Sequence, residues 1–222
     1  MTEQDVLFED NHIIIVNKRA GQLVQVDDSR DQPLDEIVKA FLKKKYKKEG
    51  NVFLGVIHRL DRPVSGCIIF AKTSKALARL NKMFQEKKIQ KTYWALSLKA
   101  PAQNSGKVST YLVKDRSKNK TKSFSKKVKG GKFSELEYEK IKSIRGEALI
   151  EVNPLTGRPH QIRVQLASIG CIIKGDLKYG APAPNDDKSI CLHSRKVQLI
   201  HPVSKEQICV TAPIHQKLLW GL

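Results

Sequence analysis

Short strand-like segments separated by turns of a few residues run through this 222-residue chain and constrain its fold more than any other feature. They are continuous apolar runs or alternating patterns, and they cover residues 6–8, 12–16, 67–71, 92–98, 133–144, 147–152, 190–200 and 207–211. Consecutive strands joined by short turns favour an α+β fold with a largely antiparallel or mixed β-sheet, flanked by helices and loops.

Three segments have helical spacing instead. Pro33 opens the first, which has an apolar face and ends in a basic run. Thr73 or Ser74 is positioned to cap the second, and the third carries residues 160–168. A chain of this length can bury one good core, so we expect a single domain over residues 1–222.

One carboxylate stands between two arginines, directly before an apolar strand, in the segment His58-Arg59-Leu60-Asp61-Arg62-Pro63-Val64-Ser65-Gly66. An opposite charge within about 4–6 Å favours the ionised form of a carboxyl group. Asp61 is therefore a candidate nucleophile or base at neutral pH. An ordinary surface ion-pair cluster is the alternative. Ser65-Gly66 is predicted to be a tight turn before the strand.

This segment, followed by the apolar strand and Ala71-Lys72-Thr73, resembles the signature H-R-L-D-x-x-x-S-G of the RluA-type pseudouridine synthases. Further segments resemble the family's other motifs and follow in the family's order: Glu9 to Lys18, Lys91 to Ala95, Gly157 to Arg163, Gly175-Asp176, Tyr179-Gly180, Leu192-His193 and His201-Pro202. The resemblance extends from near residue 7 to near residue 213, which is almost the whole chain.

The resemblance implies an isomerase of RNA uridine that breaks the bond between N1 and C1′, rotates the base and rejoins it through C5. It places the catalytic aspartate on Asp61 and an arginine that pairs with it on Arg163. It places on Tyr93 a tyrosine that packs against the target base. From the residues alone, a structural salt bridge is the alternative for Arg163, and a core position is the alternative for Tyr93.

A uridine inside folded RNA must be extruded before its C1′ can be reached. Arg59 is a candidate to fill the gap, because a guanidinium plane stacks on bases. A simple ion pair is the equal alternative. His160 and His193 are expected to be structural hydrogen-bonding residues.

Three positions depart from the family pattern. Arg19 stands where proline is usual, Gln165 stands where histidine is common, and Ile172 stands where proline is usual. These departures bear on substrate preference more than on chemistry. Some family members carry an N-terminal S4 RNA-binding domain, but the residues before His58 already resemble the catalytic fold, so we expect no separate S4 domain.

Forty-one Lys and Arg residues against 22 Asp and Glu give a formal net charge of +19, so the chain should attract polyanions. RNA is the first candidate partner and an anionic membrane surface is the second. No apolar run approaches the ~20 residues that span a bilayer, and the acidic start is no secretory signal. We expect a cytoplasmic monomer that does not bind membranes.

Much of the excess charge lies in two segments. Residues 114–132 hold nine basic residues and one acidic, and residues 43–49 hold five and one. A charge run is usually a solvated face or a mobile loop, yet such density favours phosphate contacts that position RNA. Few aromatic residues interleave with these lysines. The candidate RNA-binding residues are Arg59, Arg62, Arg158, Lys118, Lys120, Lys122, Lys126 and Lys127.

The cysteines Cys67, Cys171, Cys191 and Cys209 occur singly, without C-x-x-C spacing, so buried free thiols are expected rather than metal ligands or disulfides. The chain has neither an H-E-x-x-H motif nor a glycine-rich phosphate loop. We expect no metal site and no cofactor.

Two other functions compete with an RNA isomerase. A non-catalytic RNA-binding or chaperone protein would explain the charge, but it needs no ionised carboxylate facing a polyanion. A hydrolytic glycosylase typically needs a second carboxylate to activate water, and none accompanies the Asp61 motif.

Overall fold

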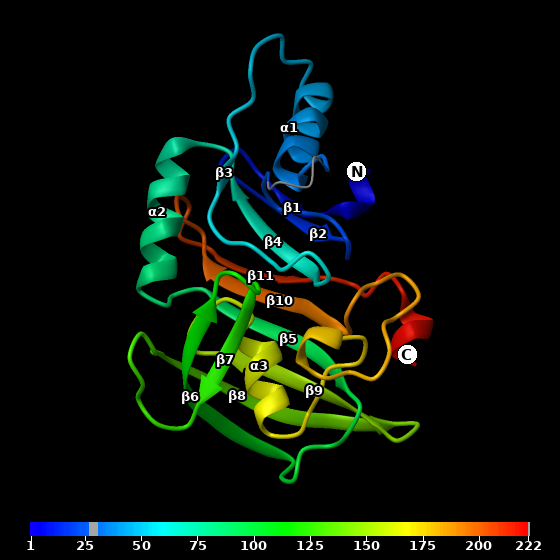
Figure 1. Cartoon of the computed structure of the whole chain (residues 1–222). Helices are drawn as coiled ribbons and strands as arrows, with labels where there is room; N and C mark the ends of the chain where they lie inside the picture. Colours follow the sequence, from blue (N-terminus) through cyan, green and yellow to red (C-terminus); the bar gives the residue numbers. More distant parts are fainter. Residues whose placement is uncertain (27–30, 222) are drawn as a thin grey trace. The chain divides into compact units, whose positions relative to one another are not determined.

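The computed structural model describes residues 1–26 and 31–221 (Figure 1). Its internal contacts divide the chain into two compact units. The first unit comprises Met1–Gln90 and Ser194–His215, and the second comprises Lys91–His193 and Gln216–Leu222. That both act as one catalytic domain stays a prediction.

Six strands lie in, or mostly in, the described part of the first unit: β1 (Val6–Glu9), β2 (Ile13–Lys18), β3 (Gly55–Val56), β4 (Ser65–Ala71), β10 (Leu192–Ile200) and β11 (Gln207–Thr211). The strand order is β1-β2-β4-β10, with β11 paired to β10 and β3 paired to β4. The pairs β1/β2, β2/β4, β3/β4 and β10/β11 are all antiparallel. A short 3₁₀ helix, Glu3–Asp5, precedes β1.

Two helices cover opposite faces of the central strands in this unit. Helix α1 (Leu34–Lys45) has Pro33 at its N-cap, and it packs with alternate residues of β2 and β4, including Ile14 and Phe70. Helix α2 (Ser74–Gln85) begins where the Thr73 hydroxyl accepts a hydrogen bond from the Ala76 N–H at 3.2 Å. It packs with the intervening residues, including Ile15 and Ile69. Burial on both faces explains why β2 and β4 are continuous apolar runs.

The second unit is built on five strands: β5 (Gln90–Ser97), β6 (Ser105–Asp115), β7 (Lys120–Phe124), β8 (Lys132–Ile144) and β9 (Glu147–Pro154). Their order is β5-β9-β8-β6-β7, and the neighbours are antiparallel. Helix α3 (Gln161–Ser168) packs through Val164 against Leu112 of β6 and Tyr179. Two 3₁₀ helices, Leu177–Tyr179 and Lys217–Trp220, complete the unit.

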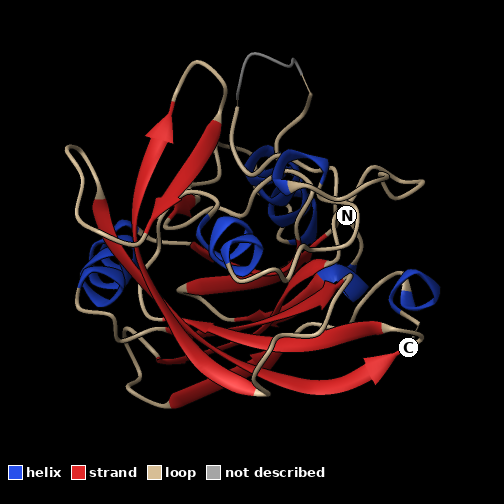
Figure 2. Ribbon diagram, turned by 60° about the horizontal axis from the view of Figure 1, so that its bottom comes forward, coloured by secondary structure: helices blue, strands red, loops and turns tan. Residues whose placement is uncertain are grey.

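Strands make up most of the regular structure, with helices beside them, so the predicted α+β class is confirmed (Figure 2). Each predicted strand is present within a few residues of its expected bounds. Among the described residues, no helix has both the length and the apolar character needed to cross a membrane.

Three local predictions were wrong. Ser65 and Gly66 are the first residues of β4 rather than a separate turn. Gly66 has φ +112°, and a Cβ there would lie 2.3 Å from the Ser194 carbonyl oxygen, so close strand packing requires glycine. The basic segment 114–132 is not a plain loop, because β7 pairs along β6 within it. Cys209 is exposed, since alternate residues of β11 point outward, whereas the other three cysteines are buried free thiols.

Candidate active site

Asp61 lies in the first unit, half-buried, on the connection between β3 and β4. The buried side chains of Leu60 and Val64 anchor the chain on either side of it. The Val64 N–H donates to the Asp61 carbonyl oxygen at 3.0 Å, which closes a turn. This turn presents the carboxylate from a short, well-anchored loop.

The two arginines beside Asp61 are both exposed. The guanidinium of Arg62 forms an ion pair with Asp31, with 2.5 Å between Nη2 and Oδ2. Both side chains of this pair are about half exposed, so it contributes little to stability. Arg59 is exposed, as a contact with nucleic acid would require.

His58 fixes the start of the same loop. Its Nε2 accepts a hydrogen bond from the Ile69 N–H of β4 at 3.0 Å, and its ring stacks on Phe84 of α2 at 5.0 Å between centroids. The acceptor role of Nε2 places the ring proton on Nδ1. His58 therefore ties the Asp61 loop to a strand and a helix.

Lys18 supports the Asp61 loop from within the protein. Its side chain is fully buried, and Nζ donates to the carbonyl oxygens of Arg19 at 3.0 Å, Arg62 at 3.1 Å and Val64 at 2.6 Å. Burial lowers the pKa of Lys18 to about 7, while the negative charge of Asp61 acts in the opposite direction. Sequence reasoning missed this role, although a lysine at the end of the buried apolar run of β2 was a signal.

A pH titration of stability should reveal the Lys18 environment. Between pH 7 and pH 10.5 the folded Lys18 is mostly neutral while the unfolded lysine keeps its proton, so the unfolding free energy should rise with pH. We expect the stability of wild type minus that of Lys18→Met to increase with pH, by up to about 1.4 kcal/mol per pH unit. Urea denaturation from pH 6 to pH 9 measures this difference.

Lys75→Met is the matched control, because Lys75 is an exposed lysine on α2. Its stability difference from wild type should not change over the same pH range. A difference for Lys18→Met that is equally flat would show that the three carbonyl acceptors keep Lys18 charged in the folded protein.

Arg163 lies on α3 in the second unit, and its side chain is only 6% exposed. It forms a bidentate pair with Asp176: Nε donates to Oδ2 at 2.7 Å and Nη2 donates to Oδ1 at 2.8 Å. The structural salt bridge considered as an alternative is therefore present, with Asp176 as the partner. The predicted pairing of Arg163 with Asp61 stays a prediction, since each residue is described within its own unit.

Tyr179 connects this pair to the basic hairpin of β6 and β7. The guanidinium carbon of Arg163 lies 5.1 Å from the centre of the Tyr179 ring. The Tyr179 hydroxyl accepts a hydrogen bond from the Thr121 N–H of β7 at 2.9 Å and lies 2.8 Å from Nδ1 of His160. His160 thus has the structural hydrogen-bonding role expected of it. Beyond the family motif, no sequence pattern indicated the Tyr179 contacts.

Tyr93 lies on β5 of the second unit, opposite Val152 of β9, and is 8% exposed. This position fits a core tyrosine, and its predicted contact with the target base stays a prediction. Arg158 is exposed on the turn before α3, where its main-chain N–H donates to the Gln161 side chain at 3.0 Å.

Gln165, a departure from the family pattern, has a structural role. It is fully buried, and its Nε2 donates to the carbonyl oxygens of Val108 and Ser134 at 3.1 and 3.0 Å and to the Thr110 hydroxyl at 3.0 Å. These contacts tie α3 to β6 and β8. The expectation that this position bears on substrate preference therefore has no support from its contacts.

The proposed RNA-binding lysines Lys118, Lys120, Lys122, Lys126 and Lys127 are all exposed. They lie on β7 and on the two connections that flank it. Because every second residue of a strand points to the same face, Lys120 and Lys122 project from one face of β7 while Thr121 is buried. The hairpin is thus a folded support for the lysines.

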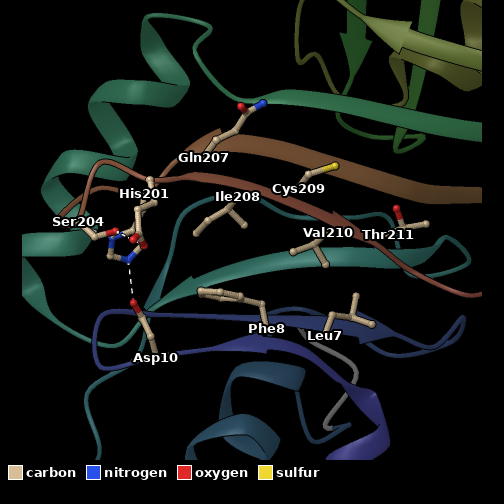
Figure 3. A pocket seen from close by; sticks show the side chains of 11 residues that line it. Leu7, Phe8, Asp10, His201, Ser204, Gln207, Ile208, Cys209, Val210 and Thr211 are labelled. Atoms are coloured by element: carbon tan, nitrogen blue, oxygen red, sulfur yellow. Dashed lines mark hydrogen bonds and ion pairs between the residues drawn. The ribbon is translucent and has the colours of Figure 1, made fainter.

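A separate cavity of about 420 Å³ lies between β1 and β11 of the first unit (Figure 3). At one end, Ser204 Oγ lies 2.9 Å from His201 Nδ1, and His201 Nε2 lies 2.9 Å from Asp10 Oδ2. A serine that contacts a histidine, which in turn contacts an aspartate, resembles the catalytic triad of a hydrolase. However, Nδ1 already accepts the N–H groups of Val203 and Ser204 at 3.2 and 2.8 Å, so the ring caps a turn instead of serving as a base.

Asp61 is not among the residues that line this cavity. In residues 1–26 and 31–221, no three His, Cys, Asp or Glu side chains gather in a way that could hold a metal ion.

Comparison with known proteins identifies relatives over most of the chain. A family model described as RNA pseudouridylate synthase matches residues 12–168. An uncharacterised RNA pseudouridine synthase of Bacillus subtilis is 34% identical over 95% of this chain and 68% of its own length. A ribosomal large subunit pseudouridine synthase C of Vibrio cholerae is 30% identical over 97% of this chain and 67% of its own length. The chain thus spans about two-thirds of the length of these relatives.

Solved structures show the same fold at lower identity. The human RNA pseudouridylate synthase domain containing 4 matches with a TM-score of 0.82 and 21% identity, over 99% of this chain and 92% of that one. The human RNA pseudouridylate synthase domain containing 1 matches with a TM-score of 0.75 and 20% identity, over 95% and 83% of the two chains.

Proposed function

The chain belongs to the RNA pseudouridylate synthase family, of the RluA type, and is an isomerase that converts uridine to pseudouridine in RNA; from this premise we propose that Asp61 carries the reaction and that ribosomal or transfer RNA supplies the uridine. The observation that carries the proposal is the Asp61 loop. His58 and Lys18 hold it by hydrogen bonds to main-chain groups, and a half-buried carboxylate stands at its centre.

The chemistry requires little beyond one positioned carboxylate. The bond between N1 and C1′ breaks, the uracil rotates, and a bond forms between C5 and C1′; C5 then loses its proton and N1 takes one up, so the product is an isomer of the substrate. Asp61 acts in this sequence either as a nucleophile that forms a covalent intermediate or as a base. The reaction is a redox-neutral isomerisation.

Arg163 and Tyr93 are proposed to assist Asp61. Asp176 engages Nε and one terminal nitrogen of the Arg163 guanidinium, which fixes the plane of the group. The other terminal nitrogen is the one that we assign to Asp61. Tyr93 is proposed to pack against the target base and to assist removal of the C5 proton. Arg59, which is exposed, is proposed to fill the gap left by the extruded uridine.

Ribosomal RNA is favoured as the substrate, because the relative of Vibrio cholerae is named for the large ribosomal subunit. The net charge of +19 supports a large polyanionic partner. We expect a monomeric cytoplasmic enzyme that requires no cofactor.

The test uses RNA carrying tritium at C5 of uridine. Isomerisation replaces the C5 hydrogen by carbon, so the enzyme should release tritium into water and leave the RNA chain uncleaved. A protein that only binds RNA would release none, and a hydrolytic glycosylase would release free uracil instead. Mapping pseudouridines in RNA from cells with and without the gene should then identify the RNA.

The lysines of the hairpin should bind RNA by charge. Replacing Lys118, Lys120, Lys122, Lys126 and Lys127 with glutamine should weaken binding to all RNAs alike and should leave turnover at saturating RNA nearly unchanged. For every phosphate that a lysine no longer neutralises, the slope of log K against log salt should fall by about 0.7 on single strands or about 0.9 on a duplex.

A matched control removes the same charge elsewhere, through the exposed lysines Lys75, Lys82, Lys87, Lys88 and Lys142. The control should keep the wild-type salt slope. Equal slopes for wild type and both variants would show that the hairpin lysines are merely solvated, and the tethering role would then pass to Lys43–Lys48.

A further inference from the structure

Three aromatic residues form a row across neighbouring strands of the second unit. In the register of the sheet, Tyr111 of β6 is the partner of Phe124 of β7 on one side and of Phe133 of β8 on the other (Figure 1 shows these strands). Directly paired residues project from the same face of a sheet. Strand pairing therefore brings together residues that are 13 and 22 positions apart along the chain.

The two outer rings of this row are accessible. Phe124 is 37% exposed and Phe133 is 47% exposed. The ring of Tyr111 meets that of Phe133 edge to face, with 5.7 Å between centroids and 68° between planes. This contact restricts the orientation of Phe133. Large exposed apolar side chains gathered at one place mark an interaction surface.

Lysines surround this aromatic row. The end of the connection from β7 to β8 lies beside Tyr111, because a Cβ added at Gly131 would lie 3.2 Å from the Tyr111 Cβ. This connection carries the exposed Lys126, Lys127 and Lys129. Lys122 projects from the same face of β7 as Phe124.

The residues that follow Phe133 along β8 carry negative charge. Glu135 and Glu137 follow Phe133 on the same face of β8, and Lys107 pairs with both at 3.4 and 3.2 Å. These carboxylates disfavour an RNA path along β8. The lysines and the carboxylates together direct a polyanion across the strands, along the aromatic row.

We propose that Tyr111, Phe124 and Phe133 form a stacking platform for two or three bases of unpaired RNA, whose phosphates the surrounding lysines neutralise. Strands lie about 4.8 Å apart, so three rings span about 10 Å, which suits this number of bases. The inference rests on the proposed function in that the RNA is the enzyme's substrate. It replaces the expectation that lysines alone position the RNA.

The test compares single-stranded and duplex RNA. The first probe is a fluorescent oligouridine of about 12 nucleotides, which is long enough to cover one stacking site. The second probe is a duplex RNA of the same length. Phe124→Ala and Phe133→Ala should each weaken binding of the single strand by about fivefold to a hundredfold. Binding of the duplex should change less than twofold, because its bases are paired. The salt slope should stay as in wild type.

Two further variants separate stacking from sheet stability. Phe133→Ile keeps a strand-forming apolar side chain but has no π face, so it should lose single-strand affinity as Phe133→Ala does while keeping the wild-type melting temperature. Ile141→Ala is the matched control, because Ile141 is 44% exposed on the same strand outside the row. It should bind both probes as wild type does.

Two outcomes would overturn the proposal. Phe124→Ala and Phe133→Ile could leave single-strand binding unchanged, or they could weaken duplex binding as much as single-strand binding. Tritium release by the wild-type enzyme is measured in parallel. If turnover occurs and the aromatic variants bind normally, only the platform is rejected, whereas absence of turnover rejects the proposed function itself.

Discussion

Replacing Asp61 with asparagine should abolish pseudouridine formation and leave RNA affinity nearly intact. The amide keeps the shape of the carboxylate but loses its charge, its nucleophilicity and its ability to accept a proton. Loss of a covalent or basic catalytic group costs many powers of ten in turnover, so we expect a fall of at least about a thousandfold. Single-turnover tritium release at saturating RNA measures the effect.

Asp61→Asn should also act on Lys18, which provides a second, independent readout. The charge of Asp61 raises the pKa of Lys18 against the effect of burial. Without that charge the pKa of Lys18 falls further, so the pH range over which stability rises should begin at a lower pH. Urea denaturation of Asp61→Asn from pH 5 to pH 9 should show this shift.

Asp31→Asn is the matched control. It removes a carboxylate that pairs with Arg62, next to Asp61 in the sequence, and its side chain is 53% exposed. Its turnover should stay within a few-fold of wild type. Turnover of Asp61→Asn above about one per cent of wild type would reject the role of Asp61.

Local patterns predicted eight of the eleven described strands, but not β3, β6 or β7, and a local motif located Asp61 in the chain. The support of the Asp61 loop is not local. Lys18 reaches carbonyl groups that lie 44 and 46 residues away, and this contact depends on how β2 pairs with β4. Asp176, 13 residues after Arg163, likewise follows no helical or strand spacing that would mark it as a partner.

The basic hairpin was missed for a different reason. Its charge density matched that of a solvated loop, yet Lys120-Thr121-Lys122-Ser123-Phe124 alternates with the period of a strand. The aromatic row was invisible in the sequence, because only the register of three strands brings Tyr111, Phe124 and Phe133 together. Cys209 was misassigned because an apolar neighbourhood hid the same alternation in β11.

Breaking the pair of Arg163 and Asp176 should have the second-largest effect. Asp176→Asn leaves a buried guanidinium without its carboxylate, and such a loss destabilises a protein by about 3–5 kcal/mol. Arg163→Lys should keep only part of the wild-type stability and turnover, since a point charge cannot reproduce two parallel hydrogen bonds. Glu147→Gln is the control, because the half-buried pair with Lys174 at 2.9 Å should contribute about 1 kcal/mol or less.

A double variant separates the structural role of Arg163 from its proposed role in catalysis. Arg163→Met with Asp176→Leu removes both charges and fills the site with apolar side chains, which often restores the stability lost in the single variants. If Arg163 acts on Asp61, the double variant should fold like wild type and still lose turnover at saturating RNA. Recovery of turnover together with stability would show that Arg163 only holds the second unit together. A loss confined to KM would make Arg163 a phosphate contact instead.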